Sequence, residues 1–114
     1  MVTWSRQKDF RIQQVVQFLN ENPSLTLPEL ARDCQMSMSR LSHLFKDEIG
    51  IIVKDYRMEC RLQVAAAMLA LTRMPIKEIA YTSGYRHSSS FARAFKTHFG
   101  LSPARYRTRL RQAA

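Results

Sequence analysis

Residues 45–57 read FKDEIGIIVKDYR, and residues 95–107 read FKTHFGLSPARYR. Phe, Lys, Gly, Tyr and Arg recur in the second stretch at a constant offset of 50 residues. An apolar stripe with i, i+4, i+8 spacing recurs as well, as Leu41, Phe45 and Ile49 in the first copy and as Phe91, Phe95 and Phe99 in the second. Further upstream the offset is 49, so the second copy has one extra residue, between Tyr85 and Phe91. Two copies are too few for a solenoid, and the pattern predicts a duplicated supersecondary unit.

Each copy is predicted to be a helix-turn-helix unit in an all-α chain. Apolar residues recur with a period near 3.6, no segment alternates as a half-buried strand would, and the few glycines and prolines separate the periodic segments. About seven helices are expected, near 9–20, 27–34, 38–49, 53–72, 75–82, 88–99 and 103–112. Gly84 is expected to end a helix in the left-handed conformation. Serines are expected as N-caps: Ser37 or Ser39 for the helix at 38–49, one of Ser88 to Ser90 for the helix at 88–99, and Ser102 for the last helix.

The expected helix at 53–72 carries two apolar stripes on roughly opposite sides. One stripe begins at Val53 and ends at Leu71, and the other begins at Met58 and ends at Leu69. This pattern favours a strut between two subdomains, with residues 1–52 as the first, 53–72 as the linker helix and 73–114 as the second. A central helix in a single bundle is the alternative. A helix of about 19 residues rises ~28 Å.

The net charge of +9 is concentrated in the second half of the chain. Residues 1–50 hold six basic and six acidic side chains, whereas residues 51–114 hold twelve basic and three acidic ones. No acidic residue follows Glu78. Such a field attracts polyanions, and by itself it does not distinguish DNA, RNA, an anionic membrane surface or a merely solvated basic face.

Enzymes, metal proteins and membrane-spanning proteins are not indicated. Cys34 and Cys60 are two cysteines without histidines at ligand spacing, so buried free thiols are expected rather than a zinc site. The sequence shows no nucleophile with a base at motif spacing, no glycine-rich phosphate loop and no carboxylate cluster. No stretch approaches the ~18–20 apolar residues of a membrane span. We therefore expect no catalysis, no metal and no cofactor.

The most specific stretch is IKEIAYTSGYRHSSSFARAFKTHFGLSPARYR, residues 76–107. Its Ile-Ala, Gly-Tyr, Phe-x-Arg-x-Phe-Lys, Gly, Ser-Pro and Tyr-Arg elements, in that order and spacing, resemble the DNA-binding domain of the AraC/XylS family of bacterial transcription regulators. The resemblance covers about residues 9–110. It implies two helix-turn-helix subdomains joined by a long helix, with both recognition helices entering double-stranded DNA.

The resemblance also implies which residues contact DNA. The base-reading positions of the family fall on Ser39, Ser42, His43, Ser89, Ser90 and Arg93. Arg93 is the strongest candidate, because arginine pairs bidentately with guanine or reaches phosphate. By their charge and position, seven further residues are expected to contact the phosphate backbone of the DNA: Arg40, Lys46, Arg86, His87, Lys96, Arg105 and Arg107. Solvated surface is the plain alternative for each, and for Arg107 a bracing role is equally open.

The short serines of the second recognition helix stand where many family members carry longer side chains. We therefore expect the neutral first unit to contribute more of the discrimination between bases and the basic second unit to contribute more of the affinity for DNA. The expected function is sequence-specific binding of double-stranded DNA by a cytoplasmic bacterial transcription regulator, an activator rather than a repressor. Alternatives are a non-specific nucleic-acid binder and a module that contacts RNA polymerase. RNA polymerase is a candidate partner and membranes are not. A monomer is expected for this stretch of chain, with dimerisation through an absent domain left open.

Overall fold

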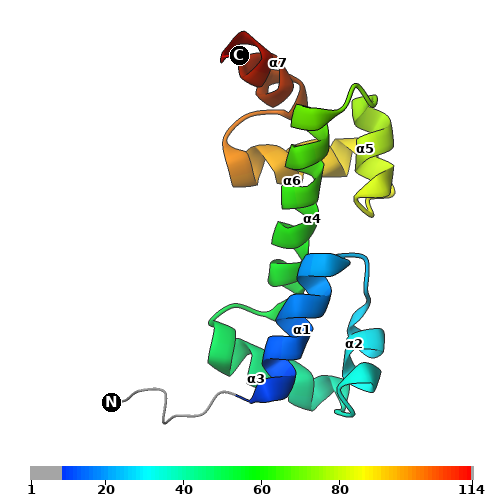
Figure 1. Ribbon diagram of the computed structural model, residues 1–114, viewed down its shortest axis with the longest axis vertical. Helices are drawn as coiled ribbons and strands as arrows, with labels where there is room; N and C mark the ends of the chain where they lie inside the picture. The colour runs from blue at the N-terminus through cyan, green and yellow to red at the C-terminus, as the bar shows by residue number, and fades with distance from the viewer. Residues whose placement is uncertain (1–8, 114) are drawn as a thin grey trace. The chain divides into compact units, whose positions relative to one another are not determined.

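The computed structural model describes the backbone of residues 9–113 and the side chains of residues 9–112. Seven α-helices and no strands make up this part of the chain. They are α1 (Phe10–Glu21), α2 (Leu27–Asp33), α3 (Met38–Ile49), α4 (Val53–Leu71), α5 (Ile76–Thr82), α6 (Ser88–Phe99) and α7 (Pro103–Ala113), as labelled in Figure 1. The all-α prediction is confirmed, and every predicted helix is present to within a residue or two at each end.

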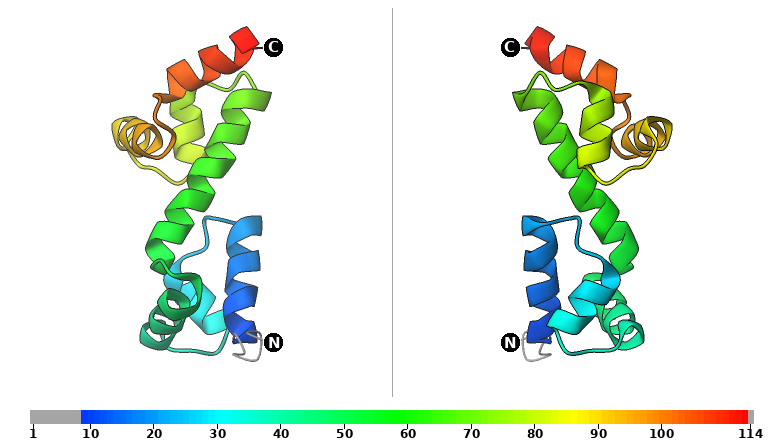
Figure 2. Two further views of the ribbon diagram at one scale, coloured as in Figure 1. Left: turned by 90° about the vertical axis from the view of Figure 1, so that its left-hand side faces the viewer. Right: turned by 90° about the vertical axis from the view of Figure 1, so that its right-hand side faces the viewer.

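The duplication seen in the sequence is a duplication of structure. Helices α3 and α6 begin and end 50 residues apart, whereas α2 and α5 begin and end 49 residues apart. The extra residue therefore lies in the connection between α5 and α6, residues 83–87, as the alignment of the two copies predicts. In Figures 1 and 2, α5 and α6 cross at a steep angle, which is typical of a helix-turn-helix unit.

The chain divides into two compact units whose boundary lies between Met58 and Glu59, inside α4. In the first unit, α3 packs against both α1 and α2. Its core combines one face of each helix with the start of α4, and its buried apolar residues are Ile12, Val15, Leu19, Leu30, Ala31, Cys34, Leu41, Phe45 and Val53. Tyr56 closes this core from α4, because its ring meets Phe45 edge-on at 5.5 Å and its hydroxyl donates to Asn20 Oδ1 at 3.0 Å.

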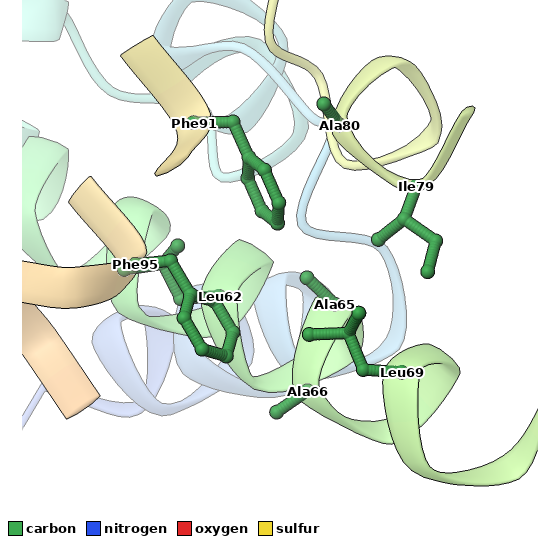
Figure 3. Close-up of a cluster of buried hydrophobic side chains, with 8 residues drawn as sticks. All are labelled: Leu62, Ala65, Ala66, Leu69, Ile79, Ala80, Phe91 and Phe95. Carbon is green, nitrogen blue, oxygen red and sulfur yellow. The ribbon is translucent and has the colours of Figure 1, made fainter. Parts of the chain in front are cut away.

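In the second unit, α5, α6 and the later part of α4 enclose a separate core. Figure 3 shows its eight buried members: Leu62, Ala65, Ala66, Leu69, Ile79, Ala80, Phe91 and Phe95. Phe99 and Tyr106 pack against this cluster from α6 and α7, with ring centroids 4.4 and 5.2 Å from that of Phe95. The aromatic stripe of α6 therefore faces inward and fixes which side of α6 is exposed.

Helix α4 contributes a different face to each unit. The stripe that begins at Val53 is buried there and half-buried at Tyr56 and Cys60, but it is exposed at Val64, Ala67 and Leu71. The other stripe is exposed at Met58 and buried at Leu62, Ala65 and Leu69. Each stripe is thus covered along only part of the helix, which the residue pattern alone does not reveal.

The turns of the two units have the same backbone geometry. Gln35, with φ of 57°, is the only residue other than glycine with positive φ among those described, and Gly84, with φ of 93°, is its counterpart at an offset of 49. The N–H groups of Gln35 and Met36 donate to Arg32 and Ala31, and those of Gly84 and Tyr85 donate to Tyr81 and Ala80. Both α2 and α5 therefore end in a Schellman motif. The predicted role of Gly84 is confirmed.

The helix caps are less alike. Ser37 caps α3 by accepting from the Arg40 N–H at 3.0 Å, and Ser102 accepts from the Arg105 N–H at 3.2 Å at the start of α7. The prediction of a serine cap for α6 is wrong, because α6 begins at Ser88 and its N-cap is His87, without a side-chain cap hydrogen bond. The three serines lie inside the first turn instead of before it.

Candidate nucleic-acid interface

The outward face of α3 carries the predicted contacts of the first unit. Leu41 and Phe45 are buried on one side of the helix, and Ser39 and His43 are exposed on the other, one turn apart. Ser42 is half-buried, so it is less accessible to a ligand than Ser39 is. Histidine and serine can hydrogen-bond to base edges, and a major groove is wide enough to admit a helix with such a face.

The outward face of α6 repeats this arrangement with a stronger cation. Phe91 and Phe95 are fully buried, and Ser89, Ser90 and Arg93 are exposed. Arg93 stands at the position of His43 in the repeat, at an offset of 50. The structure therefore exposes five of the six residues predicted to read bases, and it places all six on the second helix of a helix-turn-helix unit.

The residues predicted to contact the DNA backbone lie on α3 and α6, in the turn before α6 and on α7. Six of the seven are exposed: Arg40, Lys46, Arg86, His87, Lys96 and Arg105. Lys46 Nζ donates to the Gly50 carbonyl at 3.3 Å, so this cation is shared with the C-terminus of its own helix. Arg86 and His87 lie in the turn before α6, and Arg105 lies in the first turn of α7.

Arg107 is the exception among the seven. Its Nε donates to the Leu69 carbonyl at 3.1 Å and its Nη2 donates to the Thr72 carbonyl at 3.3 Å, at the C-terminal end of α4. Burial, followed by the charge of Arg111, lowers the pKa of Arg107. These contacts favour the bracing role for Arg107, which joins α7 to the end of α4.

Helix α3 makes a contact with the start of α1 that sequence reasoning missed. Asp9 is the N-cap of α1, and its own N–H donates to both carboxylate oxygens of Glu48, at 3.0 and 3.1 Å. Glu48 lies in the last turn of α3, so the contact joins the start of α1 to the end of α3. The hydrogen bond to Arg11 holds the pKa of the Asp9 carboxyl down at about 2. The two partners are 39 residues apart, and no local pattern marks such a pair.

Sequence reasoning also passed over an acidic residue on the outward face of α3. Asp47 follows His43 by one helical turn, and its Oδ2 lies 3.5 Å from His43 Nε2. The two side chains are 61% and 79% exposed, so the pair lies at the surface. The residue at the corresponding position of α6 is Thr97. An i, i+4 acid–base search along α3 would have found this pair.

The described residues do not suggest another kind of site. Among them, no group of three or more His, Cys, Asp and Glu side chains could hold a metal ion. Burial raises the pKa of the Cys34 thiol, which is typical of an inert core cysteine. No helix in the described range 9–113 is both long enough and apolar enough to cross a membrane.

Known proteins share this fold and sequence pattern. A family described as a helix-turn-helix domain matches residues 30–109. The chain is 32% identical over 102 residues to the arabinose operon regulatory protein of Escherichia coli (strain K12), which covers 87% of this chain and 35% of that protein. It is 37% identical over 106 residues to the RCS-specific HTH-type transcriptional activator RclR of the same organism, which covers 91% of this chain and 37% of that protein.

A solved structure agrees with these matches. The DNA-binding domain of AdpA, a global transcriptional factor whose structure was solved with a target DNA, has a TM-score of 0.82 to this chain. The match covers 90% of this chain and 95% of that one, and at 23% identity it shows the fold alone. The chain spans only about a third of the length of the two curated relatives. The matched helix-turn-helix family and these two relatives show that the chain belongs to the AraC family of DNA-binding transcription regulators.

Proposed function

We propose that the protein activates transcription and that each unit reads its half of the DNA site through the outward face of α3 or α6. One observation carries the proposal. At matching positions of the repeat, opposite the buried apolar stripes, the two helices expose Ser39 with His43 and Ser89 with Arg93. Serine and histidine suit flexible hydrogen bonding to base edges, and arginine suits guanine.

The two units divide the work unequally in this proposal. In the second unit, Arg86, His87, Lys96 and Arg105 are exposed as Arg93 is, and no acidic residue follows Glu78. Phosphate neutralisation by such a set makes binding strong and dependent on salt. In the first unit Arg40 and Lys46 are the flanking cations and α3 also carries Asp47, so the face is closer to neutral. We expect α3 to supply more of the base discrimination and α6 more of the affinity.

Selection of genomic DNA on the purified protein, followed by gel shifts of the recovered sites, tests the proposal. His43→Ala and Arg93→Ala are each expected to cost about 1–3 kcal/mol at one base position and to relax the preference there. Lys96→Ala should weaken binding to selected and to random DNA by the same factor, and it should reduce the slope of log affinity against log salt concentration by about 1. Arg73→Ala, an exposed arginine outside both recognition helices, is the charge-matched control. A uniform loss from all three variants would instead identify a non-specific binder.

The spacing of the two contacts is part of the same proposal. We expect α3 and α6 to enter successive major-groove segments on one duplex, because a helix the length of α4 rises ~28 Å against a DNA turn of ~34 Å. Hydroxyl-radical footprinting should then show two protected segments about one turn apart, and Arg93→Ala should weaken the protection of only one of them. A single protected segment with the unaltered protein would contradict this spacing.

Activation requires a further partner, for which we propose RNA polymerase in the bacterial cytoplasm. The relative RclR is named as a transcriptional activator, which supports the direction of the effect. Transcription in vitro from a selected promoter, with and without the chain, measures the sign. Sedimentation of the isolated chain, with and without DNA, measures the proposed monomeric state.

The proposed domain division, 1–52, 53–72 and 73–114, has its own test. If the two units fold separately, Phe45→Ala and Phe95→Ala should each shift a different one of two resolvable unfolding transitions and leave the other in place. A single unfolding transition that both variants shift equally would instead support one bundle with α4 as its central helix.

A further inference from the structure

The outward face of α3 combines a candidate base reader with a carboxylate, and α6 has no such pair. His43 Nε2 lies 3.5 Å from Asp47 Oδ2, across one turn of the helix. Both side chains are largely exposed and neither belongs to a core of its unit. At the corresponding places of the second unit stand Arg93 and Thr97. The difference is therefore confined to the outward face of two helices whose buried stripes correspond.

Energetics in the free protein do not account for this pair. An exposed ion pair of this kind contributes little to stability, and it requires a protonated imidazole. Asp47 is also one of only nine acidic residues in a chain with eighteen basic ones, and it lies on the helix through which the first unit is proposed to read DNA. A carboxylate there opposes DNA binding unless something in the groove offsets its charge.

Two partners in the complex could offset the charge. The first is the His43 imidazole, already next to it. The second is a base amino group, because aspartate accepts a hydrogen bond from cytosine N4 in the major groove. Some DNA sites provide neither the base that His43 contacts nor an amino group within reach of Asp47. At such a site the Asp47 carboxylate loses water near the phosphates, and no new hydrogen bond offsets that cost. The repulsion is then largest on the wrong sequences, which is how an unfavourable contact produces specificity.

We propose that Asp47 is a specificity-determining residue of the first unit. Asp47 positions the His43 imidazole. It also lowers the affinity for DNA sequences whose major groove has no base that can hydrogen-bond to His43 or Asp47. This inference rests on the proposed reading of DNA by α3. It adds that the first unit discriminates through a repulsive contact, whereas the second unit has only attractive ones at the same positions.

The chain itself provides the decisive substitution, Asp47→Thr, which places the residue of the second unit in the first. We expect its affinity for random DNA to rise about threefold, since one negative charge leaves the interface. Affinity for the selected site should instead fall by a little under twofold, because His43 loses the side chain that positions it. The ratio of specific to random binding then falls about fivefold, and the base preference opposite His43 broadens. Glu21→Gln, which removes one exposed negative charge at the far end of α1 from the Asp9–Glu48 contact, should leave the ratio within about twofold.

A double-mutant cycle separates positioning from bulk charge. In a His43→Ala background, Asp47→Thr is expected to change the base preference opposite position 43 by no more than about twofold, because the imidazole that Asp47 positions is gone. Equal factors on selected and random DNA would overturn the inference, as would an undiminished effect of Asp47→Thr without His43. If the unaltered protein binds all DNA sequences equally, the proposed function itself is wrong. That result is seen before any Asp47 variant is measured. Circular dichroism of each variant confirms that α3 is intact.

Discussion

Replacement of Gln35 by glycine should make the first unit more stable. Gln35 is the C′ residue of the Schellman motif that ends α2, and its φ of 57° lies in the left-handed region. A residue with a Cβ costs roughly 1–2 kcal/mol in that region. Glycine removes this cost but adds about 0.5–1 kcal/mol of backbone entropy to be lost on folding. The side chain of Gln35 is exposed, so no buried contact is lost.

The net gain for Gln35→Gly is therefore about 0.5–1 kcal/mol in the free energy of unfolding. For a unit of this size that corresponds to a rise of roughly 2–8 °C in Tm. Urea unfolding followed by circular dichroism measures the change, with the requirement that the m-value stays constant so that the shift in midpoint reports stability. The effect should appear in the transition of the first unit if the two units unfold separately.

Two further variants test the cause. Gln35→Ala keeps the Cβ and the strain, so we expect its midpoint to stay within about 0.3 kcal/mol of the unaltered protein. Gly84→Ala imposes the strain on the second unit, where the added Cβ would also lie 3.2–3.4 Å from the guanidinium of Arg61. It should cost about 1–2 kcal/mol. Strain at position 35 would be refuted if Gln35→Gly lowered stability, or if Gln35→Ala raised it equally.

Three other substitutions test the core, the brace and the charge network. Phe95→Ala should destabilise the second unit by about 3–5 kcal/mol in urea unfolding, and a smaller loss than for half-buried Phe99→Ala would contradict the described core. Arg107→Lys keeps the charge but not the planar fork that reaches two carbonyls, so a loss of about 1–2 kcal/mol is expected; an unchanged midpoint would favour phosphate contact alone. The pKa of Asp9 is depressed from 3.8 to about 2 by Arg11, so the unfolded state binds this proton more readily. The stabilisation by Asp9 is then present above pH 3.8 and lost as the pH falls through about 2. Asp9→Asn should therefore make the urea midpoint depend less on pH across that range.

Most of the fold could be predicted because local and repeated signals agreed. The apolar stripe of α3 and its copy in α6 predicted both helices and their buried faces, and the offset change predicted where the extra residue lies. Left-handed geometry could be predicted at Gly84 but not at Gln35. Glutamine has no preference for that region, and the surrounding Schellman hydrogen bonds impose it.

The candidate site was predictable to a different extent. Exposure of Ser39, His43, Ser89 and Arg93 followed from the buried stripes, since a residue opposite the core on a helix must face outward. The contacts of Arg107 with α4 and of Glu48 with the start of α1 join residues nearly 40 positions apart. Local patterns do not encode such pairs, because they form only when the tertiary structure brings distant backbone groups together.

The difference between the units follows from which positions a duplicated scaffold leaves open to change. Phe45 and Phe95 are both fully buried, so any substitution there leaves a cavity or forces neighbours apart. His43 and Arg93, and likewise Asp47 and Thr97, are exposed at matching positions, so their replacement costs the fold little. Binding chemistry can therefore differ between α3 and α6 while the helices that present it stay the same. It follows that exchanging these two outward pairs between the units should exchange their shares of specificity and salt dependence, with little change in the free energy of unfolding.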